Sequence, residues 1–337
     1  MGWAIFNCLR VVLWGLCWLF AIGLAAWAAL ALSIDLPMAA ARIPAAIAFG
    51  IGVLAALIFV RGQAWKLLTA FCACIVVLVW WLTIPPSNER NWQGDVDRTA
   101  YAEIDGDTVT IHNVRNFDYR AEFDYTPRWE TRTYDLSQIR GVDLFLTFWG
   151  SPWIAHPIAS FEFADGQHVA FSIEVRKEVG EAYSSVLGFF RQYELIYTIA
   201  DERDVVRLRA NYRTGEDVYL YRSTAPAEVA RAVFLDYLRS VNELHAAPVF
   251  YNALTSNCTT NIRLHTKAVS GDKVAPWDWR LLLNGKSDEF AYQYGRLVTD
   301  DLPFDELKRR AHINDAARAA DQAPDFSARI RQDRPGF

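Results

Sequence analysis

HPIASFEFADGQHVAFSIEV, residues 156–175, is the stretch of sequence that decides the fold. Its two apolar halves, 156–163 and 168–175, flank Asp165-Gly166, a dipeptide typical of the tight turn in a β-hairpin. The stretch therefore predicts two adjacent antiparallel strands in the middle of the chain. The same hairpin carries His156 at its first residue and Glu174 close to its last.

More strands are expected on both sides of this hairpin, and helices mainly after it. Gly106 lies between two short alternating segments that predict another hairpin. The expected strands are 101–105, 108–114, 117–125, 128–134, 142–149, 195–199, 205–209 and 218–221. Helices are expected over 181–192 and, with apolar residues at helical spacing, over 227–244. The pattern predicts an α+β domain built on an antiparallel sheet.

The first 84 residues have the composition of a membrane anchor. Residues 11–34 form an uncharged run without proline, and 43–60 and 67–84 are two further uncharged runs. A bilayer-spanning helix needs roughly 20 apolar residues, so three transmembrane helices are expected. The alternative is a signal peptide cleaved after Ala29-Leu30-Ala31, but the first run exceeds the usual apolar core of such a peptide.

The basic residues beside these runs indicate an orientation. Arg10 precedes the first run, and Arg61 and Lys66 lie between the second and third, on the same side of the membrane. The positive-inside rule places them in the cytoplasm, so the larger domain is expected in the periplasm of a bacterial inner-membrane protein. The inverted topology is the alternative.

The rest of the chain is acidic. Only four of the 34 Lys and Arg residues and one of the 39 Asp and Glu residues lie before residue 85, which leaves a net charge of −8 beyond it. Nucleic acid is therefore not an expected partner, because its binding needs a basic surface. We expect an anchor over 1–84, a linker over 85–98, a domain over 99–300, and a peripheral helix with a polar tail over 301–337.

Cys258 is the only cysteine beyond residue 75. An oxidising compartment usually holds cysteines in pairs, so a single one is either a buried inert thiol or a reactive group. Ser256 and Asn257 are good N-cap residues, which would place Cys258 in the first turn of a helix. There the helix dipole lowers a thiol pKa, and the N–H groups at Cys258 and Thr259 can receive an oxyanion. Asn257-Cys258-Thr259 also matches a glycosylation sequon, a pattern common by chance.

A thiol nucleophile needs a base, most often histidine. His156 opens a strand and can aim its ring at a helix packed on the sheet, whereas His265 lies two helical turns beyond Cys258 and is too far away. Glu174 is a candidate to orient the imidazole, although spacing alone equally allows a solvated charged face. No pair of potential ligands shows a tight zinc spacing, and neither a metal nor an organic cofactor is expected.

Several separated motifs, in this order, resemble the Lnb N-terminal periplasmic domain family of bacteria. They are NVRNFDYRAEFDYTPRWETRTYDL (113–136), HPIASFEFADGQHVAFSIEVRKEVGEAYS (156–184), FFRQYELIYTIADERDVVRLR (189–209) and YNALTSNCTTNIR (251–263). The resemblance covers roughly residues 91–296. It implies a permuted papain-like fold, similar to the NlpC/P60 thiol enzymes, in which histidine precedes cysteine.

The resemblance implies a catalytic Cys258 and His156, with Glu174 as the orienting residue. The family's name-giving member is a lipoprotein N-acyltransferase in which membrane spans follow the thiol domain, whereas here they precede it. We therefore expect a membrane-anchored thiol acyltransferase or hydrolase acting on a lipid or lipoprotein. A cysteine peptidase or amidase acting on cell-wall peptide and a non-catalytic scaffold module are the alternatives. The sequence does not indicate an oligomeric state.

Overall fold

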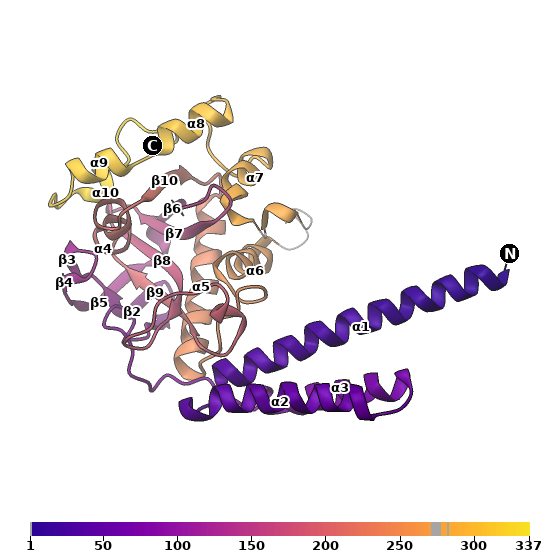
Figure 1. Ribbon diagram of the computed structural model, residues 1–337. Helices are drawn as coiled ribbons and strands as arrows, with labels where there is room; N and C mark the ends of the chain where they lie inside the picture. The colour runs from indigo at the N-terminus through magenta and orange to yellow at the C-terminus, as the bar shows by residue number, and fades with distance from the viewer. Residues whose placement is uncertain (1, 271–277, 282) are drawn as a thin grey trace. The chain divides into compact units, whose positions relative to one another are not determined.

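The computed structural model describes residues 2–270, 278–281 and 283–337. The chain divides into two compact units (Figure 1). The first comprises Met1–Pro86 and the separate segment Ser184–Tyr193, and the second comprises Ser87–Tyr183 and Glu194–Phe337. The unit boundary at residue 86 falls close to the expected start of the linker, but the inclusion of 184–193 in the first unit was not expected.

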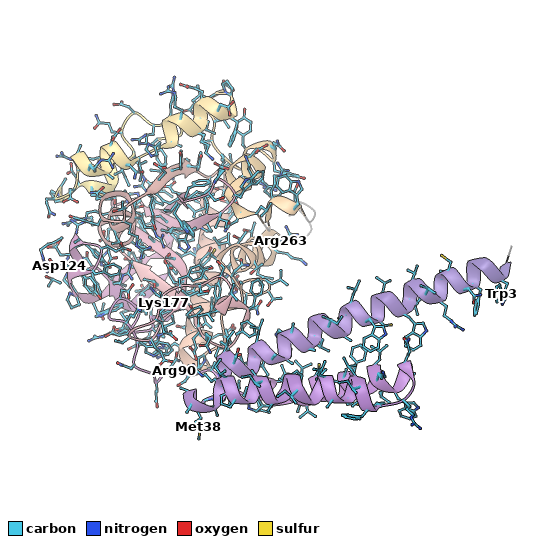
Figure 2. All side chains as sticks on the ribbon, in the orientation of Figure 1. Trp3, Met38, Arg90, Asp124, Lys177 and Arg263 are labelled. Carbon is cyan, nitrogen blue, oxygen red and sulfur yellow. The ribbon has the colours of Figure 1, made fainter. Side chains whose placement is uncertain are left out.

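The first unit contains three apolar helices, as the sequence predicts. They are α1 (Gly2–Asp35), α2 (Ala39–Phe59) and α3 (Gln63–Leu82). Each is long and apolar enough to cross a membrane. Most of their large apolar side chains are exposed, as lipid-facing residues are. Figure 2 draws the side chains of the three helices as sticks, with Trp3 labelled near the start of α1 and Met38 just before α2.

The second unit is built on a mainly antiparallel sheet, which confirms the α+β class. Among the described residues the strand order is β1-β2-β9-β8-β7-β6-β10, with β5 paired to β2 and a separate hairpin of β3 and β4. The strands are β1 (Tyr101–Asp105), β2 (Thr108–Arg115), β3 (Asp118–Ala121), β4 (Asp124–Thr126), β5 (Trp129–Asp135), β6 (Ile139–Trp149), β7 (Ala155–Phe163), β8 (His168–Arg176), β9 (Glu194–Ala200) and β10 (Glu216–Arg222). The predicted hairpin over residues 156–175 forms the central strand pair, β7 and β8.

Helices cover both faces of this sheet. Because side chains alternate along a strand, neighbouring residues of β7 face opposite sides. Phe161 packs against Phe234 of α5 (Ala227–Ala246), with ring centroids 4.9 Å apart. Ile158 belongs instead to a core cluster with Val205 of α4 (Glu202–Arg207) and with residues of the C-terminal segment. Helix α6 (Cys258–Ser270) contacts α5, β7 and β8.

The C-terminal segment differs from the expected polar tail. It forms α8 (Phe304–Ala311), α9 (Asn314–Ala319) and α10 (Phe326–Arg329) (Figure 1). Phe326 and Ile330 are fully buried in the core cluster, and Arg331 forms ion pairs with the buried carboxylates of Asp143 and Glu202. Sparse apolar residues anchor a segment that is polar by composition.

Three predicted elements are wrong. Residues 205–209 are helical, because Asp201 caps α4 by accepting a hydrogen bond from the Arg203 amide, and the helix continues into a π-helical turn, Leu208–Tyr212. The helix expected over 181–192 is reduced to the 3₁₀ turn Leu187–Phe189. The expected strand over 117–125 is interrupted, and β3 and β4 fold back on each other.

Candidate active site

His156 lies at the start of β7 with its imidazole hydrogen-bonded to two residues of β8. Its Nε2 is 2.7 Å from the Ser172 Oγ and 3.2 Å from Glu174 Oε1, and the Ser172 hydroxyl donates to that carboxylate oxygen at 2.7 Å. Ser172 and His156 are buried. The three side chains thus form one hydrogen-bonded group.

Strand register explains why these residues meet. In the β7–β8 pair Ile158 is opposite Ser172, so continuing the register by two residues brings His156 opposite Glu174. Ser172 and Glu174 are two apart on β8 and share a face. The sequence predicts the hairpin but not this register, and it therefore left the pairing of His156 with Glu174 open.

Arg209 binds the same oxygen of the Glu174 carboxylate as His156 and Ser172. Its Nη2 donates to Glu174 Oε1 at 2.9 Å, while its Nη1 lies 3.2 Å from Glu216 Oε2. Arg209 is buried and lies in the π-helical turn, a rare conformation that occurs frequently at functional sites. Because residues 205–209 were expected to form a strand, a contact between the Arg209 side chain and Glu174 was not expected.

The charges of this group shift one another's pKa values. Burial by itself lowers the pKa of His156, but the adjacent Glu174 carboxylate and the hydrogen bonds of the imidazole outweigh burial, so this pKa is raised. Burial by itself raises the pKa of Glu174, but His156 and Arg209 outweigh it and hold this pKa well below the usual value. The carboxylate is therefore charged at neutral pH and stabilises an imidazolium.

Cys258 is the first residue of α6 and its side chain is half-buried. Asn257 caps the helix, since its side-chain oxygen accepts a hydrogen bond from the Thr260 amide at 3.0 Å. The Cys258 side chain contributes to the raised pKa of the His156 imidazole, so the thiol lies near this ring. Because Nε2 is engaged by Ser172 and Glu174, Nδ1 is the ring nitrogen available to the thiol.

Asn284 is a further polar residue at the thiol. Its Nδ2 lies 3.9 Å from Cys258 Sγ and donates to Thr259 Oγ1 at 2.9 Å. The same side chain bonds both backbone groups of Ala155, donating to the carbonyl at 2.5 Å and accepting from the amide at 2.9 Å. Asn284 thus joins the start of α6 to the residue before His156.

Gly285 allows this close approach. Its amide donates to the Trp153 carbonyl, and a Cβ at this position would lie 2.4 Å from the Trp153 carbonyl carbon. Sequence reasoning missed Asn284 because Asn-Gly ordinarily signals a turn. Gly285 could have indicated the close contact at this turn, since close backbone contacts often require a glycine.

His265, on the same helix as Cys258, lies in a different environment. Its Nδ1 is 2.8 Å from Asp236 Oδ2 and its Nε2 is 2.8 Å from the Tyr197 hydroxyl. Tyr237 stacks on the ring with centroids 3.9 Å apart. Both nitrogens are occupied by structural partners, as befits a buried histidine that holds α6 to α5 and β9.

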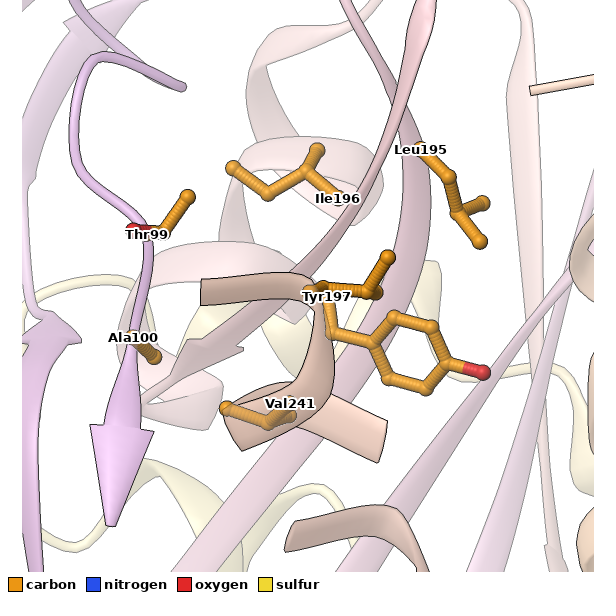
Figure 3. A pocket seen from close by; sticks show the side chains of 7 residues that line it. Thr99, Ala100, Leu195, Ile196, Tyr197 and Val241 are labelled. Carbon is orange, nitrogen blue, oxygen red and sulfur yellow. The ribbon is translucent and has the colours of Figure 1, made fainter. Parts of the chain in front are cut away.

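Tyr197 also lines a small cavity in the second unit (Figure 3). The cavity is roughly the size of a water molecule and is lined by Thr99, Ala100, Leu195, Ile196, Tyr197, Val241 and Leu244. None of these residues belongs to the group around Cys258. The cavity is therefore separate from the candidate site.

One comparison with known proteins finds a similarity over the part of the chain that contains this site. Neither a search of curated proteins nor a search of solved structures finds a match to the chain. Residues 125–285 match the family model of the Lnb N-terminal periplasmic domain, and this range contains His156, Glu174, Cys258 and Asn284. The chain is therefore similar to the Lnb N-terminal periplasmic domain over residues 125–285, and it also contains three helices able to span a membrane.

Proposed function

We propose that this protein is a membrane-anchored periplasmic thiol enzyme that transfers or hydrolyses acyl groups through a thioester on Cys258. The observation that carries the proposal is a His156 imidazole that lies 3.2 Å from the Glu174 carboxylate and whose pKa is raised by Glu174 and by the Cys258 side chain at the start of α6. This is the arrangement of nucleophile, base and orienting group that acyl transfer requires.

In the first half-reaction, His156 Nδ1 takes the thiol proton as the sulfur attacks the acyl carbonyl carbon. Glu174, held by Arg209, keeps a proton on Nε2 and stabilises the imidazolium. The tetrahedral intermediate collapses when its bond to the leaving group breaks, and His156 returns the proton to that group. A thioester and a released alcohol or amine result.

In the second half-reaction, an amine or water attacks the thioester. His156 accepts the proton of the attacking group and returns it to the departing Cys258 sulfur. The products are an acylated amine or a fatty acid, and the thiol is regenerated. The enzyme thus follows a two-step scheme with a covalent intermediate.

Two backbone donors can stabilise the oxyanion of each intermediate. The amide groups of Cys258 and Thr259 are at the first turn of α6, where N–H groups have no acceptor within the helix. Asn284 holds this turn in place, because the two hydrogens of its side-chain amide bond the Ala155 carbonyl and Thr259 Oγ1. Donors fixed in advance in this way are typically the largest contribution to acyl-transfer catalysis.

A lipid or lipoprotein is the proposed acyl donor, because the catalytic domain is tethered to a membrane. The aromatic run 144–154 offers less surface for an acyl chain than its sequence suggests, since Phe145 and Leu146 are fully buried in the sheet core. Trp153 and Ile154, just before His156, are each 47% exposed and are the part of this run that can contact an acyl chain. We further propose that the N-terminus is cytoplasmic, from the positions of Arg10, Arg61 and Lys66.

The test compares acyl donors with the full-length protein in nanodiscs. A phospholipid, a diacylated lipopeptide and a cell-wall peptide are each supplied, and release of the alcohol or amine product is measured. We expect release from the lipid or lipopeptide that is abolished in Cys258→Ser and retained in His312→Gln, a variant of a half-exposed histidine paired with Asp217. Release from the cell-wall peptide alone would identify a peptidase or amidase, and equal release by Cys258→Ser would refute thiol catalysis.

A further inference from the structure

The segment Ser184–Tyr193 belongs structurally with the three apolar helices, although β8 and β9 of the periplasmic domain flank it in sequence. Phe190 is only 4% exposed and packs in a cluster with residues of α1 and α3. The buried members of that cluster are Ala28, Ala31, Cys74, Val77 and Phe190. The buried Phe190 side chain therefore holds the segment against α1 and α3.

Polar contacts hold the segment at the C-terminal ends of α1 and α3. Gln192 Nε2 donates to Asp35 Oδ1 at 2.6 Å, and Asp35 is the last residue of α1. Arg191 donates to the carbonyl of Ile84, two residues after the end of α3, at 2.5 Å. The Arg191 guanidinium also lies 4.5 Å from the ring centroid of Trp81. Charged and tryptophan side chains at the ends of apolar helices mark the membrane–water interface.

The same segment presents apolar side chains outward. Val186, just before the 3₁₀ turn, is 59% exposed, and Phe189, its last residue, is 45% exposed. No charged residue occurs between Glu181 and Arg191. Exposed apolar side chains in a segment that packs on membrane-spanning helices favour lipid as the covering partner, because a water-exposed patch of this kind is unfavourable.

We propose that Ser184–Phe190 is an interfacial element that inserts Val186 and Phe189 into the bilayer at the ends of α1 and α3. The periplasmic domain is then tied to the membrane by the chain after α3 and again by both ends of this segment. The inference does not depend on the chemistry of Cys258, because it rests on contacts with the helices alone.

The direct test is photolabelling of the unmodified protein in nanodiscs that contain a phospholipid with a diazirine in its acyl chain. Trypsin releases residues 178–191 as one peptide, since Lys177 and Arg191 bound it. The matched control is the tryptic peptide 121–128 of the second unit, which contains Phe123, a side chain that is 88% exposed. We expect lipid adducts on Val186 or Phe189 and at least five-fold less labelling of 121–128.

Replacing both apolar side chains, Val186→Ser with Phe189→Ser, should reduce labelling of 178–191 several-fold, while labelling of the three helices stays unchanged. The helices serve as an internal measure that the variant is folded and embedded. Labelling of 121–128 equal to that of 178–191 would show that exposure alone captures the probe. Either that result or absence of adducts on 178–191 while the helices are labelled would overturn the proposal.

Discussion

Glu174 is the residue that sets the protonation of His156. It raises the pKa of that histidine, so replacing Glu174 by an uncharged amide removes the attraction to the imidazolium and leaves the effect of burial, which lowers it. We predict that in Glu174→Gln the pH midpoint assigned to His156 moves to lower pH. The measurement is the pH profile of Cys258 alkylation by iodoacetamide.

The matched control for this variant is Glu178→Gln. Glu178 lies close to Glu174 in the sequence but pairs with Arg90 rather than with His156. Its removal should leave the midpoint in place. An unchanged midpoint in Glu174→Gln would contradict the assignment of Glu174 as the partner of His156.

Asn284 positions the first turn of α6 through its hydrogen bond to Thr259 Oγ1, and alkylation and acylation of Cys258 distinguish this role. An oxyanion forms when the thiol attacks a carbonyl but not when it displaces iodide. We predict that Asn284→Ala displaces the Thr259 amide, lowers the rate of acylation by roughly 10²-fold, the usual effect of losing one oxyanion donor, and leaves alkylation of Cys258 nearly unchanged. Equal losses in both reactions would contradict a role of Asn284 in positioning the oxyanion donors.

At the scale of elements, Gly285 couples the short turn Asn284–Lys286 to the loop before β7. A methyl group at position 285 cannot fit, because it would lie within 2.6 Å of the Pro152, Trp153 and Ile154 backbone. We predict that Gly285→Ala displaces Asn284 and lowers the rate of acylation at least as much as Asn284→Ala.

The control for the loss of a glycine is Gly295→Ala in the full chain. A methyl group at position 295 would have no atom within 4 Å, although the φ of +62° there disfavours alanine. This control therefore strains the backbone without a steric clash, and it should leave acylation nearly unchanged. Unchanged acylation in Gly285→Ala as well would contradict this account of the turn.

How far the sequence predicts these elements depends on whether local signals agree with tertiary packing. The hairpin of β7 and β8 is predictable because alternation and its turn residues point to the same structure. Residues 205–209 are not, because Val205, Val206 and Leu208 suit a strand as well as a buried helix, and the Asp201 cap decides between them. Of the residues in the candidate site, the sequence predicts those that belong to recognisable motifs, which are His156, Glu174 and Cys258. Ser172, Arg209 and Asn284 depend on register and packing that spacing does not reveal.

At the scale of the whole molecule, the C-terminal segment stabilises the sheet through one buried arginine. Arg331 donates to Asp143 and Glu202, and both carboxylates are fully buried. Despite burial, its charge and those of nearby groups lower the pKa of Glu202 to about 2. Arg331→Ala would leave two buried carboxylates without this partner, and we predict a loss of about 3–5 kcal/mol in the free energy of unfolding.

Denaturant unfolding in detergent measures this loss, and Arg329→Ala is the matched control. Arg329 pairs with Asp325 at the surface, where both side chains are half-exposed and such a pair contributes little. The sign of the pH effect follows from the lowered pKa of Glu202: its contribution is present above the ordinary pKa of 4.5 and is lost as the pH falls toward 2. Equal stabilities of the two variants at pH 7 would contradict the role given to Arg331.

The three apolar helices and the periplasmic domain together make a membrane-anchored protein whose catalytic activity is our proposal. The central claim of this proposal is that a covalent acyl intermediate forms on Cys258. The most direct measurement is mass spectrometry of the tryptic peptide 240–263, which contains Cys258, after acid quenching of the protein with an acyl-chain-labelled phospholipid or lipopeptide. We predict a hydroxylamine-sensitive acyl adduct on this peptide that is strongly reduced in His156→Gln and retained in His312→Gln. An unmodified peptide in folded protein that turns over the donor, or an adduct that forms equally fast without His156, would contradict the account.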